Sequence, residues 1–186
     1  MSITAKDDES KIKNGTKIIA ALPAHNEENY IAKVIVRSRK LVDEVIVVDD
    51  GSSDTTADIA RSLGAIVIKH NINKGYGAAI KTCFKTAKER DADIMVILDS
   101  DGQHDPKYIS ELIYPISKGT DIVIGSRFIS NNGNNGNNGN DAPTYRKFGM
   151  AILDYITVFA GSEKTSDSQS GFRAYSRKAI EKIKIN

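Results

Sequence analysis

Two carboxylates at the end of an apolar run are the residues here whose chemistry is easiest to name. Asp99 and Asp101 follow residues 94–98, which read Ile-Met-Val-Ile-Leu. A short apolar run bounded by turn residues predicts a strand buried on both faces, as in a parallel sheet. Open α/β sheets bind ligands beyond the carboxyl ends of their strands, so we expect both carboxylates in a cleft. Hard oxygen ligands of this kind suit Mg²⁺ or Mn²⁺ better than zinc.

Three further apolar runs also end in polar clusters. The clusters are Pro23-Ala24-His25-Asn26-Glu27-Glu28, Asp49-Asp50-Gly51-Ser52 and Gly125-Ser126-Arg127. Each cluster alone is equally consistent with turn chemistry, because Asp, Asn, Ser and Gly are turn residues in their own right. In a parallel sheet, however, all of them share one edge with Asp99 and Asp101. That convergence favours a binding site.

The acidic pair Asp49 and Asp50, at the end of the second predicted strand, needs a different role from the pair Asp99 and Asp101. Carboxylates repel phosphate, so Asp49 and Asp50 are better read as acceptors for base N–H or ribose hydroxyl groups, as acids at a second strand end are in dinucleotide folds. For Asp49 the alternative is a loop or cap carboxylate. Lys74 and Gly75 precede a predicted helix and could bring a lysine and a helix N-terminus to phosphate. The stretch lacks the G-x-x-x-x-G-K-[ST] pattern, so this signal is weak.

Arginines supply the candidate cations. Arg127 follows a predicted strand, and a guanidinium group can donate two parallel hydrogen bonds to the oxygens of a phosphate. Arg146 and Arg173 are candidates for a second anion, although an arginine taken singly is more often a surface residue. The histidines lack a zinc-binding spacing. We expect His104 beside the metal pair, within reach of substrate, and His70 in a structural or exposed position.

The elements that must position these residues alternate along the chain. Strands are predicted at 17–22, 44–48, 65–69, 94–98 and 121–125, with helices at about 26–42, 54–63, 77–90 and 109–117. This alternation with short connections predicts a single α/β domain with a mainly parallel sheet flanked by helices.

The remaining segments are expected to be less regular. Residues 1–16 are charged and predict a loose tail, and the Asn/Gly tract 131–140 predicts a flexible loop. An amphipathic helix is predicted at 143–160. The final pattern, 178–186, begins a helix with no terminating signal, as expected of a catalytic domain (17–186) cut from a longer chain.

Composition bounds the function classes. The 186 residues are 40% hydrophobic and 27% charged, as in ordinary globular proteins. A net charge of +2 does not indicate nucleic acid as a partner. The single cysteine, Cys83, excludes an internal disulfide and is expected to be a buried thiol. No run approaches the roughly 20 apolar residues of a membrane span, and the N-terminus lacks a signal-peptide core, which predicts a cytoplasmic location.

Five motifs in order carry a family resemblance. They are PAHNEE (23–28), VVDDGSSD (47–54), DSDGQH (99–104), GSRF (125–128) and SGFRA (170–174). The sequence resembles the family 2 glycosyltransferases of GT-A fold. Within that family it is most similar to the dolichyl-phosphate mannose synthase group and its polyprenyl-phosphate glycosyltransferase relatives.

The resemblance implies a role for each matching residue. The nucleotide-sugar side would comprise Pro23, Ala24, Glu27, Asp50, Asp99 and Ser100, and the helix start at Lys74 and Gly75 described above would join it. The ligands of Mg²⁺ or Mn²⁺ would be Asp99, Asp101 and Gln103. The catalytic residues would be Asp101, Arg127 and Asp167, and the acceptor side would comprise Arg146, Ser170 and Arg173.

The expected reaction is inverting transfer of a sugar from UDP-glucose, UDP-N-acetylglucosamine or GDP-mannose to a polyprenyl (dolichyl) phosphate, with peripheral membrane contact through the acceptor at the cytoplasmic face. A phosphate nucleophile is largely dianionic at neutral pH and needs no general base. A saccharide hydroxyl would need one, and Asp167 is the candidate. Metal-dependent phosphatase, nucleotidyltransferase and non-catalytic nucleotide-sugar-binding functions remain the alternatives.

Overall fold

The computed structural model describes residues 15–125 and 171–185. Within them the strands are β1 (Ile18–Ala24), β2 (Glu44–Asp49), β3 (Ile66–Lys69), β4 (Ile94–Ile97), β5 (Ile122–Ile124) and β6 (Arg173–Ser176). The helices are α1 (Ile31–Ser38), α2 (Thr56–Ser62), α3 (Tyr76–Glu89), the short 3₁₀ helix η2 (Pro106–Tyr108), α4 (Ile109–Ser117) and α5 (Arg177–Lys182). None of these helices is long and apolar enough to cross a bilayer.

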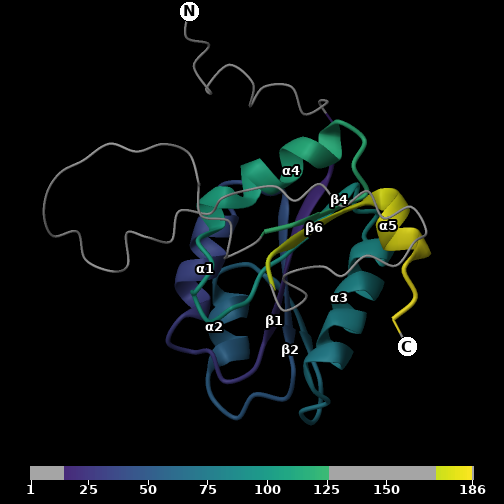
Figure 1. Cartoon of the computed structure of the whole chain (residues 1–186). Coiled ribbons are helices and arrows are strands. Elements are labelled where there is room, and N and C mark those ends of the chain that lie inside the picture. The colour runs from purple at the N-terminus through teal and green to yellow at the C-terminus, as the bar shows by residue number, and fades with distance from the viewer. Residues whose placement is uncertain (1–14, 126–170, 186) are drawn as a thin grey trace, which may run out of the picture.

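The strands form one sheet in the order β3-β2-β1-β4-β6-β5 (Figure 1). Strands β3, β2, β1 and β4 pair in parallel, which confirms the predicted α/β architecture. Strand β6 runs antiparallel to both of its neighbours and lies between β4 and β5. This strand was not among those predicted from the sequence. Its insertion moves the end of β5 one strand away from the end of β4.

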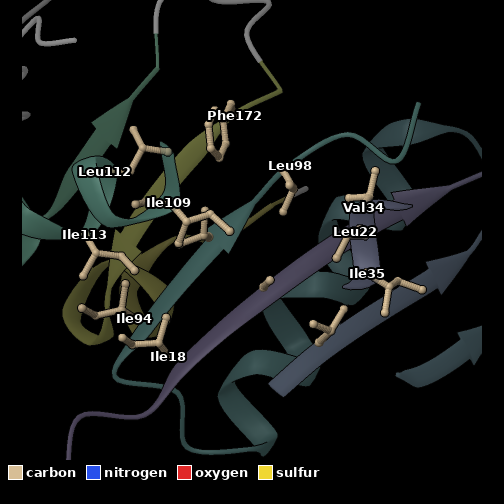
Figure 2. Packing of buried hydrophobic residues seen from close by; sticks show 14 of the residues in the cluster. Ile18, Leu22, Val34, Ile35, Ile94, Leu98, Ile109, Leu112, Ile113 and Phe172 are labelled. Atoms are coloured by element: carbon tan, nitrogen blue, oxygen red, sulfur yellow. The ribbon is translucent and has the colours of Figure 1, made fainter. Parts of the chain in front are cut away.

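Both faces of the sheet are buried, because the side chains of a strand alternate between faces. Ile18 and Leu22 of β1 belong to the core beneath α1 and α4, whereas Ile19 and Ala21 pack on the side of α3 and α5. Figure 2 shows the first of these cores, in which Leu22 lies near the side chains of α1. Burial on both sides explains why the strands read as continuous apolar runs.

Several predicted boundaries were wrong. Helix α1 begins at Ile31 rather than near residue 26, because Asn26 adopts a left-handed conformation (φ 56°). The same helix ends at Ser38, short of the predicted residue 42. Strand β1 continues through Pro23 to Ala24, whose carbonyl accepts a hydrogen bond from the backbone N–H of Asp50 at 2.8 Å.

At the C-terminal end, α5 does have a defined start and end. The Ser176 hydroxyl caps the helix by accepting from the backbone N–H of Ala179 at 3.2 Å, and the backbone becomes extended at Ile183. Cys83 is fully buried on α3, as predicted. The predicted tail (apart from residues 15–16), the Asn/Gly tract and the helix at 143–160 lie outside the described residues.

Candidate active site

An open pocket of about 390 Å³ lies at the carboxyl ends of β1, β2 and β4 and the start of α3. Its lining residues are Pro23, Ala24, His25, Glu27, Asp50, Asn73, Gly75, Tyr76, Ala79, Asp99, Ser100 and Asp101. The volume is within the range usual for small-molecule sites. The structure therefore brings the polar ends of three strands into one cavity, as expected of a parallel sheet.

Asp99 is contacted by groups from three different parts of the chain. The Tyr76 hydroxyl donates to Oδ1 of Asp99 at 3.3 Å, and Nδ1 of the buried His104 lies 3.8 Å from Oδ2. The backbone of Gly171 lies directly against the same carboxylate. Burial raises the pKa of the Tyr76 phenol, and the negative charge of Asp99 raises it further. Tyr76 therefore stays protonated and able to donate.

Asp101 and Glu27 add negative charge to the same end of the pocket. Oδ1 of Asp101 accepts from the backbone N–H of Gln103 at 2.9 Å, which orients the carboxylate. Burial raises the pKa of Glu27, and neighbouring carboxylates, led by Asp101, raise it further. This accumulation of like charge is the electrostatic condition that a bound cation relieves.

The carboxylates at this end of the pocket fit a magnesium or manganese ion whose remaining ligands come from the substrate. Among the described residues no three His, Cys, Asp or Glu side chains cluster as a full protein cage. Mg²⁺ typically binds through one or two carboxylates and takes its other ligands from water and substrate phosphates. Asp99 and Asp101 supply such a pair. Gln103 is exposed and does not line the pocket, so its role as a ligand stays a prediction.

The other end of the pocket is formed around Asp50. This carboxylate is 4% exposed and accepts hydrogen bonds from Nδ1 of His70 (2.6 Å) and from the backbone N–H groups of Lys74 (3.0 Å) and Gly75 (2.8 Å). Burial raises the pKa of Asp50, but these three bonds outweigh burial and hold it below its usual value. Asp50 is therefore a fixed anion. Lys74 contributes its backbone here, and its side chain is not among the lining groups.

Asp49 has a structural role, which was the alternative to a ligand-binding role in the sequence-based prediction. Its Oδ1 accepts from the backbone N–H of Ser52 at 2.9 Å, and Nζ of Lys69 lies 3.4 Å from Oδ2. The side chain is fully buried and lies outside the pocket lining. Of the acidic pair, only Asp50 reaches the cavity.

The loops after β1 and β2 hold each other through hydrogen bonds. Asn26 donates its backbone N–H to Ser52 Oγ (2.9 Å) and accepts from the backbone N–H of Ser53 (2.9 Å). Glu28 accepts from the Thr55 hydroxyl at 2.7 Å. Helix α2 consequently begins at Thr56 rather than at a cap on residue 53 or 54. On the third side, the Ser100 hydroxyl donates to the carbonyl of Pro23 at 2.7 Å and ties β4 to β1.

Arg173 begins β6 and pairs in register with Ile97, two residues before Asp99. Its positive charge acts on the phenol of Tyr76, so the structure places it near the metal end of the pocket. The other acceptor-side and catalytic candidates lie outside the described residues. They are Arg127, Arg146, Asp167 and Ser170.

Four of the lining residues had no role predicted from the sequence: His25, which was named only as a member of its polar cluster, Asn73, Tyr76 and Ala79. Asn73 and Tyr76 flank the Lys74–Gly75 dipeptide, and Ala79 lies one helical turn further on, so a helix start facing the cavity was the available signal. His70 was expected to be structural or exposed. It is buried and bonds directly to Asp50, a contact that no local pattern indicates.

Comparison with known proteins identifies the family. The sequence model described as "Glycosyl transferase family 2" matches residues 20–184. This chain belongs to glycosyl transferase family 2. A relative from Methanococcus voltae, named UDP-N-acetylglucosamine–dolichyl-phosphate N-acetylglucosaminyltransferase, is 37% identical over 88% of the chain and 70% of its own length. The resemblance seen in the sequence is thereby confirmed.

Solved structures agree with the family assignment. Glucosyl-3-phosphoglycerate synthase from Mycobacterium tuberculosis in complex with UDP matches 96% of this chain and 63% of its own, with a TM-score of 0.62 and 25% identity. A structure of that synthase with Mn²⁺, UDP and glucosyl-3-phosphoglycerate matches 67% of this chain and 48% of its own, with a TM-score of 0.54 and 30% identity. The family 2 chain described here thus has the GT-A fold, and these neighbours support its assignment as a metal-dependent glycosyltransferase.

Proposed function

We propose that this family 2 glycosyltransferase binds a nucleoside-diphosphate sugar in the pocket and transfers the sugar to a polyprenyl phosphate. The observation that carries the proposal is the meeting of Asp50 with Asp99 and Asp101 around one cavity. An anion at one end suits the donors of a nucleoside, and a carboxylate pair at the other suits a metal-bound diphosphate. The acceptor class follows the relative from Methanococcus voltae.

The described residues of the pocket fall into two groups, one for the nucleoside of the sugar donor and one for its metal-bound diphosphate. Asp50, Pro23 and Ala24 would contact the nucleoside, and Asp99 and Asp101 would hold Mg²⁺ or Mn²⁺. The bound ion would supply positive charge to the departing diphosphate. Tyr76 and Gly171 would keep Asp99 in place, because one donates a hydrogen bond to it and the other packs against the carboxylate.

The acceptor is proposed to react as a phosphate dianion, whose second pKa of about 6 makes it nucleophilic without a general base. Arg173 is the described cation best placed to align it, and Arg127 and Arg146 are proposed to assist. Asp167 and Ser170 would complete the acceptor side. The protein would then work at a membrane surface, since the polyprenyl chain anchors the acceptor in the bilayer, and the face proposed is the cytoplasmic one.

The test compares Asp101→Ala with Asp58→Ala, a control whose exposed carboxylate lies away from the pocket and pairs with the neighbouring Arg61. Transfer from radiolabelled UDP-N-acetylglucosamine, UDP-glucose and GDP-mannose to dolichyl phosphate is measured with Mn²⁺ or Mg²⁺. We expect Asp101→Ala to lose at least 100-fold in rate, in line with the loss of a group that stabilises developing charge. Undiminished metal-dependent transfer by Asp101→Ala would overturn the proposal. Transfer only to 3-phosphoglycerate would retain the donor site and reject the acceptor.

A further inference from the structure

Counting the described residues, the hydrogen bonds of Asp50 leave one of its acceptor positions open. An ionised carboxylate offers about four lone-pair positions. His70 and the N–H of Lys74 occupy those of Oδ1, and the N–H of Gly75 occupies one of Oδ2. Asp50 also lines the pocket. The remaining position is therefore on Oδ2.

His70 is held in the orientation that saturates Oδ1. Because a carboxylate only accepts, Nδ1 of His70 must carry the hydrogen of the 2.6 Å bond. On the other side of the ring, Nε2 lies 2.9 Å from the hydroxyl of Thr82 on α3. The backbone N–H of His70 donates to the carbonyl of Asp49 at 2.8 Å, and the side chain is 8% exposed. The ring cannot turn away without breaking these contacts.

Gly51 allows the loop before α3 to reach Asp50. A Cβ atom on Gly51 would overlap the backbone of Ile72 and Asn73, and the residue has a φ of 71°, a region that favours glycine. This close approach brings the N–H groups of Lys74 and Gly75 to the carboxylate. The donors that saturate Oδ1 of Asp50 thus come from one stretch of the chain, residues 70–75, which passes over Gly51.

We infer that His70 is a specificity-determining positioning residue, and that the pocket selects a nucleobase with a single N–H for Asp50, as uracil has at N3. Guanine presents adjacent N1–H and N2–H donors that pair best with both oxygens of a carboxylate. With Oδ1 saturated, only one of these donors finds an acceptor, and the other is desolvated without a partner. The inference rests on the proposed function, in which Asp50 faces the base.

Titration calorimetry with UDP, GDP and N3-methyl-UDP, each in the presence of Mn²⁺, tests which base the pocket selects. We expect UDP to bind at least tenfold more tightly than GDP, and at least tenfold more tightly than N3-methyl-UDP, because a hydrogen bond to a charged group is lost. GDP binding as tightly as UDP would overturn the inference and leave the proposed function standing. Equal binding of UDP and N3-methyl-UDP would also overturn it. Binding of none of the three would overturn the proposed function itself.

Variants of His70 test whether this residue determines the selectivity between the two bases. His70→Ala frees Oδ1, so the ratio of GDP to UDP dissociation constants should fall at least threefold. His70→Asn places an amide donor where Nδ1 was and should keep that ratio within twofold of the wild type. Lys85→Ala, exposed on the same α3, is the control. A residue that served folding alone would weaken both nucleotides equally, and an unchanged ratio in His70→Ala would overturn the role. If His70→Ala fails to fold, the affinities of the wild-type protein for UDP and GDP still show which base the pocket selects.

Discussion

Gly171 lies so close to Asp99 that a Cβ atom on the glycine would overlap both carboxylate oxygens of the aspartate. The two residues are 72 positions apart and meet because β6 pairs with β4. Gly171 has no unusual φ, so the requirement is for space rather than for a special conformation. The last sequence motif therefore serves the metal end of the pocket through its backbone.

Gly171→Ala is expected to displace Asp99 and reduce Mn²⁺-dependent binding of the nucleotide sugar at least tenfold. The reason is that a methyl group must take the place of the carboxylate, or the carboxylate must move away from the metal. Calorimetry with and without Mn²⁺ checks this. Binding of UDP without metal should change less than threefold, because the Asp50 end is untouched. Full metal-dependent affinity in the variant would contradict the expected clash.

Tyr76→Phe is expected to weaken Mn²⁺ binding about tenfold in the presence of UDP. The Tyr76 hydroxyl donates to Asp99 at 3.3 Å, and partners of this kind orient metal-binding carboxylates. Paramagnetic broadening of UDP signals by Mn²⁺ measures the affinity. Tyr114→Phe, on the exposed side of α4, is the matched control and should behave as the wild type. Equal affinities in both variants would exclude a role for the Tyr76 hydroxyl.

Glu44→Gln is expected to lower the free energy of unfolding at neutral pH by about 1–2 kcal/mol, allowing for solvent screening. Hydrogen bonds from Arg90 at 2.5 and 3.0 Å, aided by Lys17, lower the pKa of Glu44 from 4.5 to about 2. A carboxyl with a lowered pKa in the folded state stabilises the protein above its unfolded pKa. This contribution is lost as pH falls from about 4.5 to 2.

Urea unfolding at pH 7 and at pH 2.5 measures that difference. The gap between the wild type and Glu44→Gln should be present at pH 7 and should narrow strongly at pH 2.5. Glu89→Gln removes an exposed carboxylate 3.7 Å from Lys85 and should change stability by less than 0.5 kcal/mol. A gap that stays constant with pH would show that packing, not charge, causes the effect.

Cys83 is expected to resist thiol reagents in the folded protein. The side chain is fully buried, and burial raises the pKa of the thiol to about 12, so almost no thiolate forms at pH 8. Reaction with a disulfide reagent should proceed at least 100-fold more slowly than in urea. Rapid labelling under native conditions would mean that α3 opens from the sheet readily.

The strands and helices with strong periodicity were predictable. Helix α4 spans Ile109–Ser117 as expected, because its apolar residues repeat at helical spacing. Strand β6 was missed, since its four residues give no clear period and its pairing joins segments far apart in the chain. Helix α1 started late because Asn26 and Glu28 bond to the loop before α2 instead of opening a helix.

The sequence by itself determined that Asp50, Asp99 and Asp101 would meet at one edge of a parallel sheet, because strand direction follows from the alternation of strands and helices. Only the tertiary structure decided what surrounds them. It brought His70 to Asp50 and Gly171 to Asp99, and it buried Asp49 at the end of β2, where the carboxylate holds the turn that follows. These contacts depend on the strand order and on loops that approach each other across the sheet, and neither is encoded in local spacing.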